Sequence, residues 1–347
     1  MSSKMTAAVL YGKEDLKIEQ VAVPRVGPDE VLVRVRAALT CGTDLKVYRQ
    51  GYHARMIVPP AIFGHELAGV VEEVGDEVRN IRKGMRVVAA NSAPCGHCHY
   101  CQRDRANLCE NLLFNNGAYA EFIRVPGPIV RQNTLEIPTH IEFADAALVE
   151  PLACVLRGFE ETGLRPGDST VVIGMGPIGL MFVRLAKLRG AHVVAIGKRG
   201  SQLAAARRMG ADEVVDASKS EDLKSEIRSK TLDGAGADVA VEAVGTPRTW
   251  ELAFGTLRRG GTVNGFGGCP SGSSVRLDTA LLHYSEITLK ATFHHTPVYI
   301  RKALETISRG EIRGADFITG QAPLARLPEI LRHMANRNGD LKTAIIP

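Results

Sequence analysis

The chain has 347 residues, 45% of them hydrophobic, and its 43 basic and 38 acidic residues give a formal net charge of +5. The length favours one large or two medium domains, and the composition is that of an ordinary globular protein. Because the basic residues are scattered, we expect no nucleic-acid partner. The N-terminus has no signal-peptide core, and the most apolar run, 171–183, is too short to cross a membrane. We therefore expect a cytoplasmic protein without a membrane partner.

The first 150 residues predict a β-rich domain. Residues 30–38 alternate between apolar and polar side chains, which is typical of a half-buried strand. Residues 67–78 and 84–90 are rich in valine and are punctuated by glycine, so we predict strands there with turns at the glycines.

Four of the seven cysteines fall close together in this part of the chain. They are Cys95, Cys98, Cys101 and Cys109. In a reducing compartment such a cluster more often binds metal than forms disulfides, and four thiolates suit tetrahedral zinc. A redox pair and an iron–sulfur cluster are less favoured alternatives, and His97 and His99 are interpreted as exposed loop residues. Because four sulfur ligands leave no open position, we predict a structural zinc lobe over 92–112.

From about residue 152 the pattern changes to alternating helices and strands. We predict helices over 152–162, 179–188 and 202–209, and strands over 171–174, 192–196, 238–242 and 262–266. This alternation predicts an α/β fold with a doubly wound parallel sheet. After about residue 288 the regularity ends. We expect surface helices over 298–308 and 328–336, and a last segment that returns to the first domain.

A Gly-x-Gly-x-x-Gly turn joins the strand over 171–174 to the helix that follows it. In that context the glycines and the helix N-terminus allow close approach of a dinucleotide pyrophosphate, and a tight turn without a ligand is the less favoured alternative. Two later strand ends are expected beside the same ligand. The predicted coenzyme contacts in these three places are Gly174, Gly176, Pro177, Ile178, Gly179, Val244, Gly245, Phe266 and Gly267.

The end of the second strand indicates which dinucleotide binds. An acid about 20 residues after the glycine turn usually binds the ribose 2′-hydroxyl group. Here that position is Gly197, followed by Lys198 and Arg199, and no carboxylate follows within several residues. Basic side chains would favour a 2′-phosphate. We predict a preference for NADP over NAD, with an ordinary basic surface turn as the alternative.

Two short stretches before the cysteine cluster complete the pattern. They are Thr-Cys-Gly-Thr-Asp over 40–44 and Gly-His-Glu-x2-Gly-x5-Gly over 64–75. Taken alone, Cys41 would be a buried thiol and His65 a structural histidine. Together with the cysteine lobe and the nucleotide fold, these motifs resemble the zinc-containing medium-chain alcohol dehydrogenase family over essentially the whole chain. Glu150, where the alcohol dehydrogenases proper carry a cysteine, points to the sorbitol and threonine dehydrogenase branch.

The resemblance implies two domains. A GroES-like, β-rich catalytic domain would comprise 1–152 and 290–347, and a Rossmann coenzyme domain would comprise 153–289. It also aligns Gly197 with the position of the ribose-binding acid. The branch is usually tetrameric, so we expect a homotetramer or a homodimer, with 261–266 and 279–291 at the interface.

The resemblance also implies the roles of the site residues. Cys41 and His65 would bind a catalytic zinc, and Glu66 and Glu150 would be the nearest carboxylates, either of which can ligate. The residues with supporting roles would be Thr43, bonded to the substrate oxygen, and Asp44, which would orient His65. Two zinc ions per chain and NADP or NAD would be the cofactors.

The sequence departs from the family at Lys46, where many members carry a histidine that ends the proton relay. Either the relay ends differently here and Lys46 faces an anionic or hydroxyl-rich substrate, or Lys46 is an ordinary solvated lysine. Residues 293–297 line the pocket or form a polar loop. We expect a zinc-dependent oxidoreductase that transfers hydride between NAD(P) and a secondary alcohol of polyol, sugar or hydroxy-amino-acid type. The alternatives are a non-catalytic binding protein on the same scaffold and an NAD-linked, threonine dehydrogenase-like enzyme.

Overall fold

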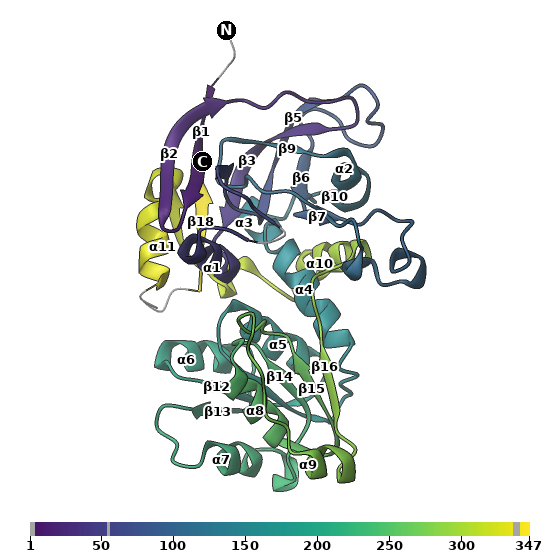
Figure 1. Ribbon diagram of the computed structural model, residues 1–347, viewed down its shortest axis with the longest axis vertical. Helices are drawn as coiled ribbons and strands as arrows, with labels where there is room; N and C mark the ends of the chain where they lie inside the picture. The colour runs from purple at the N-terminus through teal and green to yellow at the C-terminus, as the bar shows by residue number, and fades with distance from the viewer. Residues whose placement is uncertain (1–3, 54–55, 336–340) are drawn as a thin grey trace. The chain divides into compact units, whose positions relative to one another are not determined.

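The computed structural model describes residues 4–53, 56–335 and 341–347 (Figure 1). The chain divides into two compact units, 1–153 with 295–347, and 154–294. The first boundary is one residue from the predicted one. The second lies at 294/295 and not at 289/290, because β16 (Thr288–Ala291) pairs with β15 and belongs to the second unit's sheet. Among the described residues, no helix combines the length and apolar character needed to cross a membrane.

The first unit is built around a seven-stranded sheet. Its order is β10-β6-β5-β3-β18-β17, with β9 also paired to β3. The strands are β3 (Val31–Leu39), β5 (Leu67–Val74), β6 (Arg86–Ala89), β9 (Phe122–Val125), β10 (Thr134–Glu136), β17 (Ile318–Pro323) and β18 (Lys342–Ile346). On β3 only Arg34 and Arg36 are exposed, as the alternating sequence predicts. Because β18 pairs with β3, the end of the chain does return to the N-terminal sheet.

Two small sheets and six helices complete this part of the chain. The small sheets contain β1 (Lys4–Gly12), β2 (Asp15–Ala22) and β4 (Ala61–Ile62), and β7 (Ser92–Ala93) with β8 (Leu113–Phe114). The helices are α1 (Gly42–Gln50), α2 (Gly127–Asn133), α3 (Phe143–Ala146), α4 (Val149–Glu160), α10 (Pro297–Ser308) and α11 (Leu327–Ala335). Helix α4 runs across the boundary between the two units.

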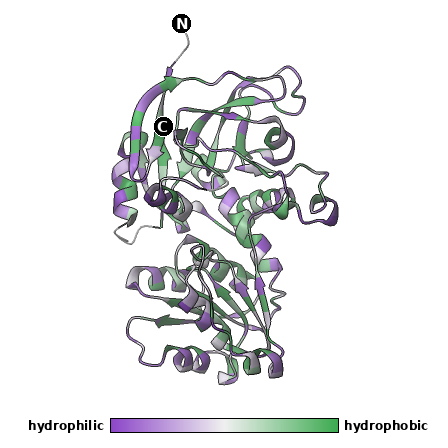
Figure 2. Ribbon diagram, in the orientation of Figure 1, coloured by the Kyte–Doolittle hydropathy of each residue, from purple (hydrophilic) through white to green (hydrophobic). Residues whose placement is uncertain are grey.

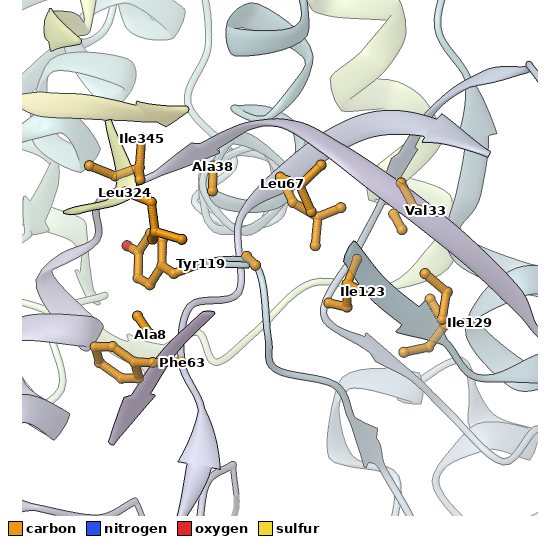
Figure 3. Close-up of a cluster of buried hydrophobic side chains, with 14 of the residues drawn as sticks. Ala8, Val33, Ala38, Phe63, Leu67, Tyr119, Ile123, Ile129, Leu324 and Ile345 are labelled. Carbon is orange, nitrogen blue, oxygen red and sulfur yellow. The ribbon is translucent and has the colours of Figure 1, made fainter. Parts of the chain in front are cut away.

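Tyr119 and Phe63 are among the largest side chains in the core of the first unit. Figure 3 shows Tyr119 among Leu324, Ala8 and Phe63, and both aromatic rings are almost fully buried. Their ring centroids lie 5.8 Å apart in a tilted arrangement, which aromatic pairs favour. This packing fixes the Tyr119 hydroxyl group close to the ends of β3 and α1.

The second unit contains a six-stranded, wholly parallel sheet in the order β13-β12-β11-β14-β15-β16. Its other strands are β11 (Ser169–Ile173), β12 (His192–Gly197), β13 (Glu213–Asp216), β14 (Ala237–Glu242) and β15 (Leu257–Gly265). Its helices are α5 (Pro177–Leu188), α6 (Gly200–Arg208), α7 (Leu223–Ser229), α8 (Pro247–Gly255) and α9 (Thr279–Tyr284). The strands of this sheet are coloured mainly hydrophobic in Figure 2, and every residue of β11 is buried. This is the doubly wound arrangement that the alternating pattern predicts.

Several predicted elements have different ends in the structure. Within the valine-rich segment 67–78, β5 ends at Val74 and the chain turns at Gly75 as predicted, where a Cβ would lie 2.2 Å from the Gly27 carbonyl oxygen. Gly69, where a turn was also predicted, lies inside β5. The helix predicted over 152–162 begins three residues earlier, at Val149, with Pro151 in the first turn, where proline is tolerated. Residue 336, the predicted end of the last helix, lies outside the described residues.

Candidate metal and coenzyme sites

Cys41 caps the N-terminus of α1. Its sulfur accepts the N–H of Thr43 at 3.4 Å, and its own N–H donates to Asp44 Oδ2 at 3.0 Å, which forms a capping box. The sulfur therefore lies at the positive end of the helix dipole. The local sequence thus fixes Cys41, Thr43 and Asp44 as one rigid turn.

Asp44 connects this turn to His65. Its Oδ1 lies 3.0 Å from His65 Nδ1, and its Oδ2 accepts the Tyr119 hydroxyl at 2.6 Å. The Tyr119 ring can come this close because residue 64 is glycine, with φ +90°, and a Cβ there would lie 2.5 Å from the ring. With Nδ1 facing a carboxylate, the imidazole is oriented and its Nε2 is left to bind a ligand.

Glu66 is fully buried beside a lysine from the other end of the chain. Lys342 Nζ lies 2.8 Å and 2.6 Å from the two carboxylate oxygens of Glu66 and also donates to the Thr40 carbonyl at 3.0 Å. Burial lowers the pKa of Lys342, but Glu66 outweighs burial and raises it, so the lysine is charged. A buried charge requires such a partner.

Glu150, in the first turn of α4, is a third buried carboxylate of the first unit's candidate site, after Asp44 and Glu66. Burial raises its pKa to about 7, and the charge of nearby His65 opposes this rise. His295 Nε2 lies 3.8 Å from Glu150 Oε1 and 3.1 Å from Asn91 Oδ1. His295 therefore belongs to a buried polar cluster and not to an exposed loop, whereas Phe293 in the same segment is about half exposed.

Cys41, His65 and Glu66 form a set that fits a metal ion. One donor atom from each lies within 4.8 Å of the others. Sulfur, nitrogen and oxygen in this combination are ligands that zinc accepts, and three protein ligands leave a fourth position open. The set does not include Glu150. Lys46 is exposed on α1.

The four clustered cysteines also fit a metal ion, but as a closed set. Their sulfur atoms all lie within 4.8 Å of one another, with Cys98 Sγ 3.5 Å from Cys101 Sγ and 3.9 Å from Cys109 Sγ. Zn–S bonds of about 2.3 Å in a tetrahedron place sulfur atoms about 3.8 Å apart. Backbone groups of Cys101 and Glu110 lower the pKa of Cys98 to about 6, which makes its thiolate available.

The predicted glycine turn follows β11 directly. Gly174 has φ +101°, and a Cβ on Gly179 would lie 1.7 Å from the Gly174 carbonyl oxygen, so both positions require glycine. A Cβ on Gly176, which caps α5, would meet nothing within 4 Å, and Pro177 opens the helix. The turn therefore leaves open space at the N-terminus of a long helix, as a phosphate site needs.

The end of β12 carries the basic residues that the sequence placed there. Gly197 is buried between Met175 and Leu203, whereas Lys198 is exposed and Arg199 caps α6. Asp216, on β13, pairs in register with Gly197, but its carboxylate accepts both the N–H and the hydroxyl of Ser218. The acid opposite Gly197 on the neighbouring strand is therefore already bonded within its own turn.

Some residues of the two units need a closer look, and others were not predicted from the sequence. The Phe266 ring packs edge-on against Phe182 at 5.0 Å between centroids, inside the second unit, and remains partly exposed. Lys342 was missed because its partner lies 276 residues away, although a lysine opening an apolar strand is an unusual feature. Tyr119 likewise carries no local motif, whereas His295 lies in the segment 293–297 that the sequence had singled out.

Comparison with known proteins agrees with this geometry. Residues 27–136 match the alcohol dehydrogenase GroES-like domain, and residues 177–309 match the zinc-binding dehydrogenase domain. The sorbitol dehydrogenase of Bacillus subtilis is 32% identical, with 99% of this chain and 97% of the relative covered. The L-threonine 3-dehydrogenase of Caldanaerobacter subterraneus is 36% identical over 76% of each chain.

A solved structure extends the match to the whole fold. A protein of Sinorhizobium meliloti, assigned as a zinc-binding dehydrogenase and solved with NADP bound, superposes with a TM-score of 0.90 at 31% identity, over 99% of this chain and all of the other. The fold is thus a GroES-like domain with a Rossmann-type coenzyme domain. The chain therefore belongs to the zinc-containing medium-chain alcohol dehydrogenases, an oxidoreductase family, in the branch similar to sorbitol and threonine dehydrogenases.

Proposed function

We propose that this protein interconverts a secondary alcohol and its ketone with NADP as the hydride carrier and one zinc ion at Cys41, His65 and Glu66. The convergence of these three donors within 4.8 Å carries the proposal. Of the two candidate carboxylates, we assign Glu66 as the zinc ligand, because one of its oxygens lies within 4.8 Å of the donor atoms of both Cys41 and His65. Glu150 is then the adjacent carboxyl group whose pKa of about 7 suits proton exchange near neutral pH.

Zinc in this position would supply a Lewis acid that lowers the pKa of an alcohol hydroxyl group. The protein's own residues would do the rest. Thr43, on the capping turn, would accept the hydroxyl proton and pass it toward solvent. Asp44 would hold the His65 ring, since a carboxylate on Nδ1 fixes both tautomer and orientation. The nicotinamide carries the electrons, because zinc has no redox chemistry.

The four-cysteine lobe would hold a second zinc that takes no part in the reaction. A complete sulfur shell has no position for a substrate, and the 3.5 Å and 3.9 Å sulfur spacings around Cys98 suit a tetrahedral ion. With the zinc at Cys41, His65 and Glu66, this gives the two zinc ions per chain that we propose.

The preference for NADP rests on the end of β12. Glycine at 197 offers no carboxylate to the ribose, Asp216 is bonded to Ser218, and Lys198 with Arg199 presents positive charge. Arginine suits phosphate oxygens because its planar group makes paired bonds. The solved relative with NADP bound supports the same choice.

The relatives support a polyol, a sugar or a β-hydroxy amino acid as substrate. The L-threonine 3-dehydrogenase relative favours a second candidate, an NAD-linked enzyme of that kind. Initial rates with sorbitol, other polyols, inositols, L-threonine and simple alcohols, each with NADP and with NAD, separate these candidates. A non-catalytic binding protein is not favoured, and it would show no rate with any pair despite bound zinc.

We further propose a cytoplasmic homo-oligomer, tetrameric or dimeric. Strand β16 is the edge of the six-stranded sheet, and Leu289 on it and Tyr284 before it are exposed. An exposed apolar edge strand is a ready pairing surface. The free cysteines suit a reducing compartment. Light scattering measures the assembly, and a monomer at micromolar concentration contradicts it.

A further inference from the structure

Glu242, the last residue of β14, is a buried carboxylate that neither metal set nor the glycine turn uses. Its side chain is 0% exposed. Glu242 Oε1 accepts the N–H of Val244 at 2.8 Å and the N–H of Gly245 at 2.9 Å. An acidic side chain is rarely buried so completely unless its oxygens are bonded. Here both bonds go to the loop between β14 and α8, so the carboxylate fixes the backbone of that loop.

The same residue also holds the next loop, after β15. Its carbonyl oxygen accepts the N–H of Phe266 at 3.0 Å and the N–H of Gly267 at 2.8 Å. A Cβ on Gly267 would lie 2.6 Å from Glu242 Oε2 and 2.4 Å from the nitrogen of Gly245, so the loops meet through bare backbone. Trp250 Nε1 donates to the Gly267 carbonyl at 3.0 Å. The two loops therefore form one block with Glu242 at its centre.

This block borders the glycine turn. In the sheet order, β14 lies beside β11, where the strand sequence reverses and where ligands of this fold bind. A Cβ on Gly174 would lie 2.6 Å from Val244 Cγ2, so the valine side chain lies directly on the first glycine of the turn. Val244 is nevertheless 45% exposed. It forms an apolar wall whose place depends on the bond from its N–H to Glu242.

We propose that Glu242 is a positioning residue for the coenzyme: by holding the Val244 and Gly245 N–H groups, it sets the wall against which the dinucleotide binds. This inference rests on the coenzyme site of the proposed function. Glu242→Ala leaves two buried N–H groups without their acceptor, which releases the loop. Glu242→Gln keeps one acceptor oxygen but exchanges an ionised acceptor for a weaker neutral one. The coenzyme should therefore bind the alanine variant most weakly and the glutamine variant with intermediate affinity.

Trp250, the only tryptophan of the chain, lies in the same block and provides the measurement. Its emission, titrated with NADP in the absence of alcohol, gives the dissociation constant without turnover, and calorimetry gives the same constant independently. Loss of the bonds to one or two buried N–H groups predicts that Kd rises about tenfold or more in Glu242→Ala. In steady state, KM for the coenzyme should rise while KM for the alcohol stays within about twofold.

Asp238→Asn is the matched control, because Asp238 lies at the other end of β14. Its Oδ2 accepts the N–H of Ser169 at 2.8 Å, and its Oδ1 pairs with Arg258. This variant should lower Tm and leave the coenzyme Kd unchanged. A purely structural role of Glu242 would give the same result as the control, with lower Tm and unchanged Kd, and would overturn the inference.

Two further outcomes are decisive. If Glu242→Ala does not fold, Glu242→Gln and the half-exposed Val244→Ala take its place, and an unchanged Kd in both rejects the inference. If the unmodified protein binds neither NADP nor NAD, the proposed function fails together with the inference. If only the inference is wrong, the unmodified protein still binds the coenzyme normally, so the two failures can be told apart.

Discussion

The four-cysteine lobe and the Cys41 set both offer thiolates to a metal, but the chain assembles them differently. The lobe takes its four ligands from one loop, and its sulfur atoms all lie within 4.8 Å of one another. The Cys41 set combines a helix cap with two residues before β5, and Lys342 reaches it from 276 residues beyond Glu66. One loop can supply all four ligands of a closed metal site, whereas an open site with three protein ligands depends on the whole fold to hold those ligands in place. The lobe is therefore expected to govern stability, and the open set to govern turnover.

The largest expected effect separates these two roles. Cys41→Ser or His65→Ala should lower kcat/KM by more than about 100-fold, because losing even a partner of a metal ligand costs 10–100-fold. Circular dichroism should remain that of the unmodified protein, and elemental analysis should show about one zinc per chain instead of two. Full turnover in protein that contains no zinc would contradict this mechanism.

Cys98→Ser is the matched variant in the lobe. It should lower Tm and yield, because the loop loses the ion around which its four sulfur atoms close. The zinc remaining at Cys41 should support near-normal kcat per folded chain. If Cys98→Ser instead abolishes turnover in a well-folded protein, the division of roles between the two metal sites is wrong.

The buried Lys342–Glu66 pair tests how far the open set depends on distant residues. In protein freed of metal by chelation, Lys342→Met leaves the Glu66 carboxylate uncompensated in the interior, and breaking a buried pair costs about 3–5 kcal/mol of unfolding free energy. Adding Glu66→Gln should recover part of this loss. The exposed Arg326–Glu329 pair, at 2.9 Å, is the control, and Arg326→Met should cost less than about 1 kcal/mol. Urea denaturation gives the unfolding free energy of Lys342→Met, of its combination with Glu66→Gln, and of Arg326→Met. Equal losses in Lys342→Met and Arg326→Met would contradict this prediction.

The pH dependence of the metal-free protein sharpens the comparison further. The pKa of Glu150 rises from an ordinary 4.5 to about 7 through burial, so the folded state holds this proton more tightly than the unfolded state. Stability from this group is then complete below about pH 4.5 and is lost as pH rises through 7, with a total change of about 3 kcal/mol. Glu150→Gln should flatten the curve over that range when unfolding is followed after chelation. An identical slope in both proteins would show that Glu150 does not titrate there.

How much of this could be predicted from the sequence depends on how local each feature is. The cysteine lobe, the glycine turn and the capping turn around Cys41 follow from residues close together in the chain, where a few side chains and a positive φ at Gly174 determine the geometry. Lys342 and Tyr119 could not be placed, because their partners are set by strand pairing across the whole first unit.

Element ends were missed for a related reason. The helix predicted from residue 152 begins at Val149, because proline at 151 is tolerated in the first turn of a helix and does not mark its start. Glu242 escaped notice because an acid at the end of an apolar strand resembles a surface residue, and only the folded loops show that its oxygens are bonded and buried.

The smallest expected effect concerns the second unit, where charge alone distinguishes two coenzymes. Lys198→Ala with Arg199→Ala should weaken NADP binding by about tenfold or more and change NAD binding little, because charge-assisted hydrogen bonds contribute about 1.5–3 kcal/mol each and only NADP has the 2′-phosphate. Arg207→Ala with Arg208→Ala, at the exposed far end of the same helix α6, removes equal charge away from the turn and should leave both constants unchanged. The effect should shrink as salt rises, since Lys198 is exposed and Arg199 is partly exposed. Equal catalytic efficiency of the unmodified enzyme with NADP and NAD would rule out the assignment of Gly197 as the residue that admits the phosphate.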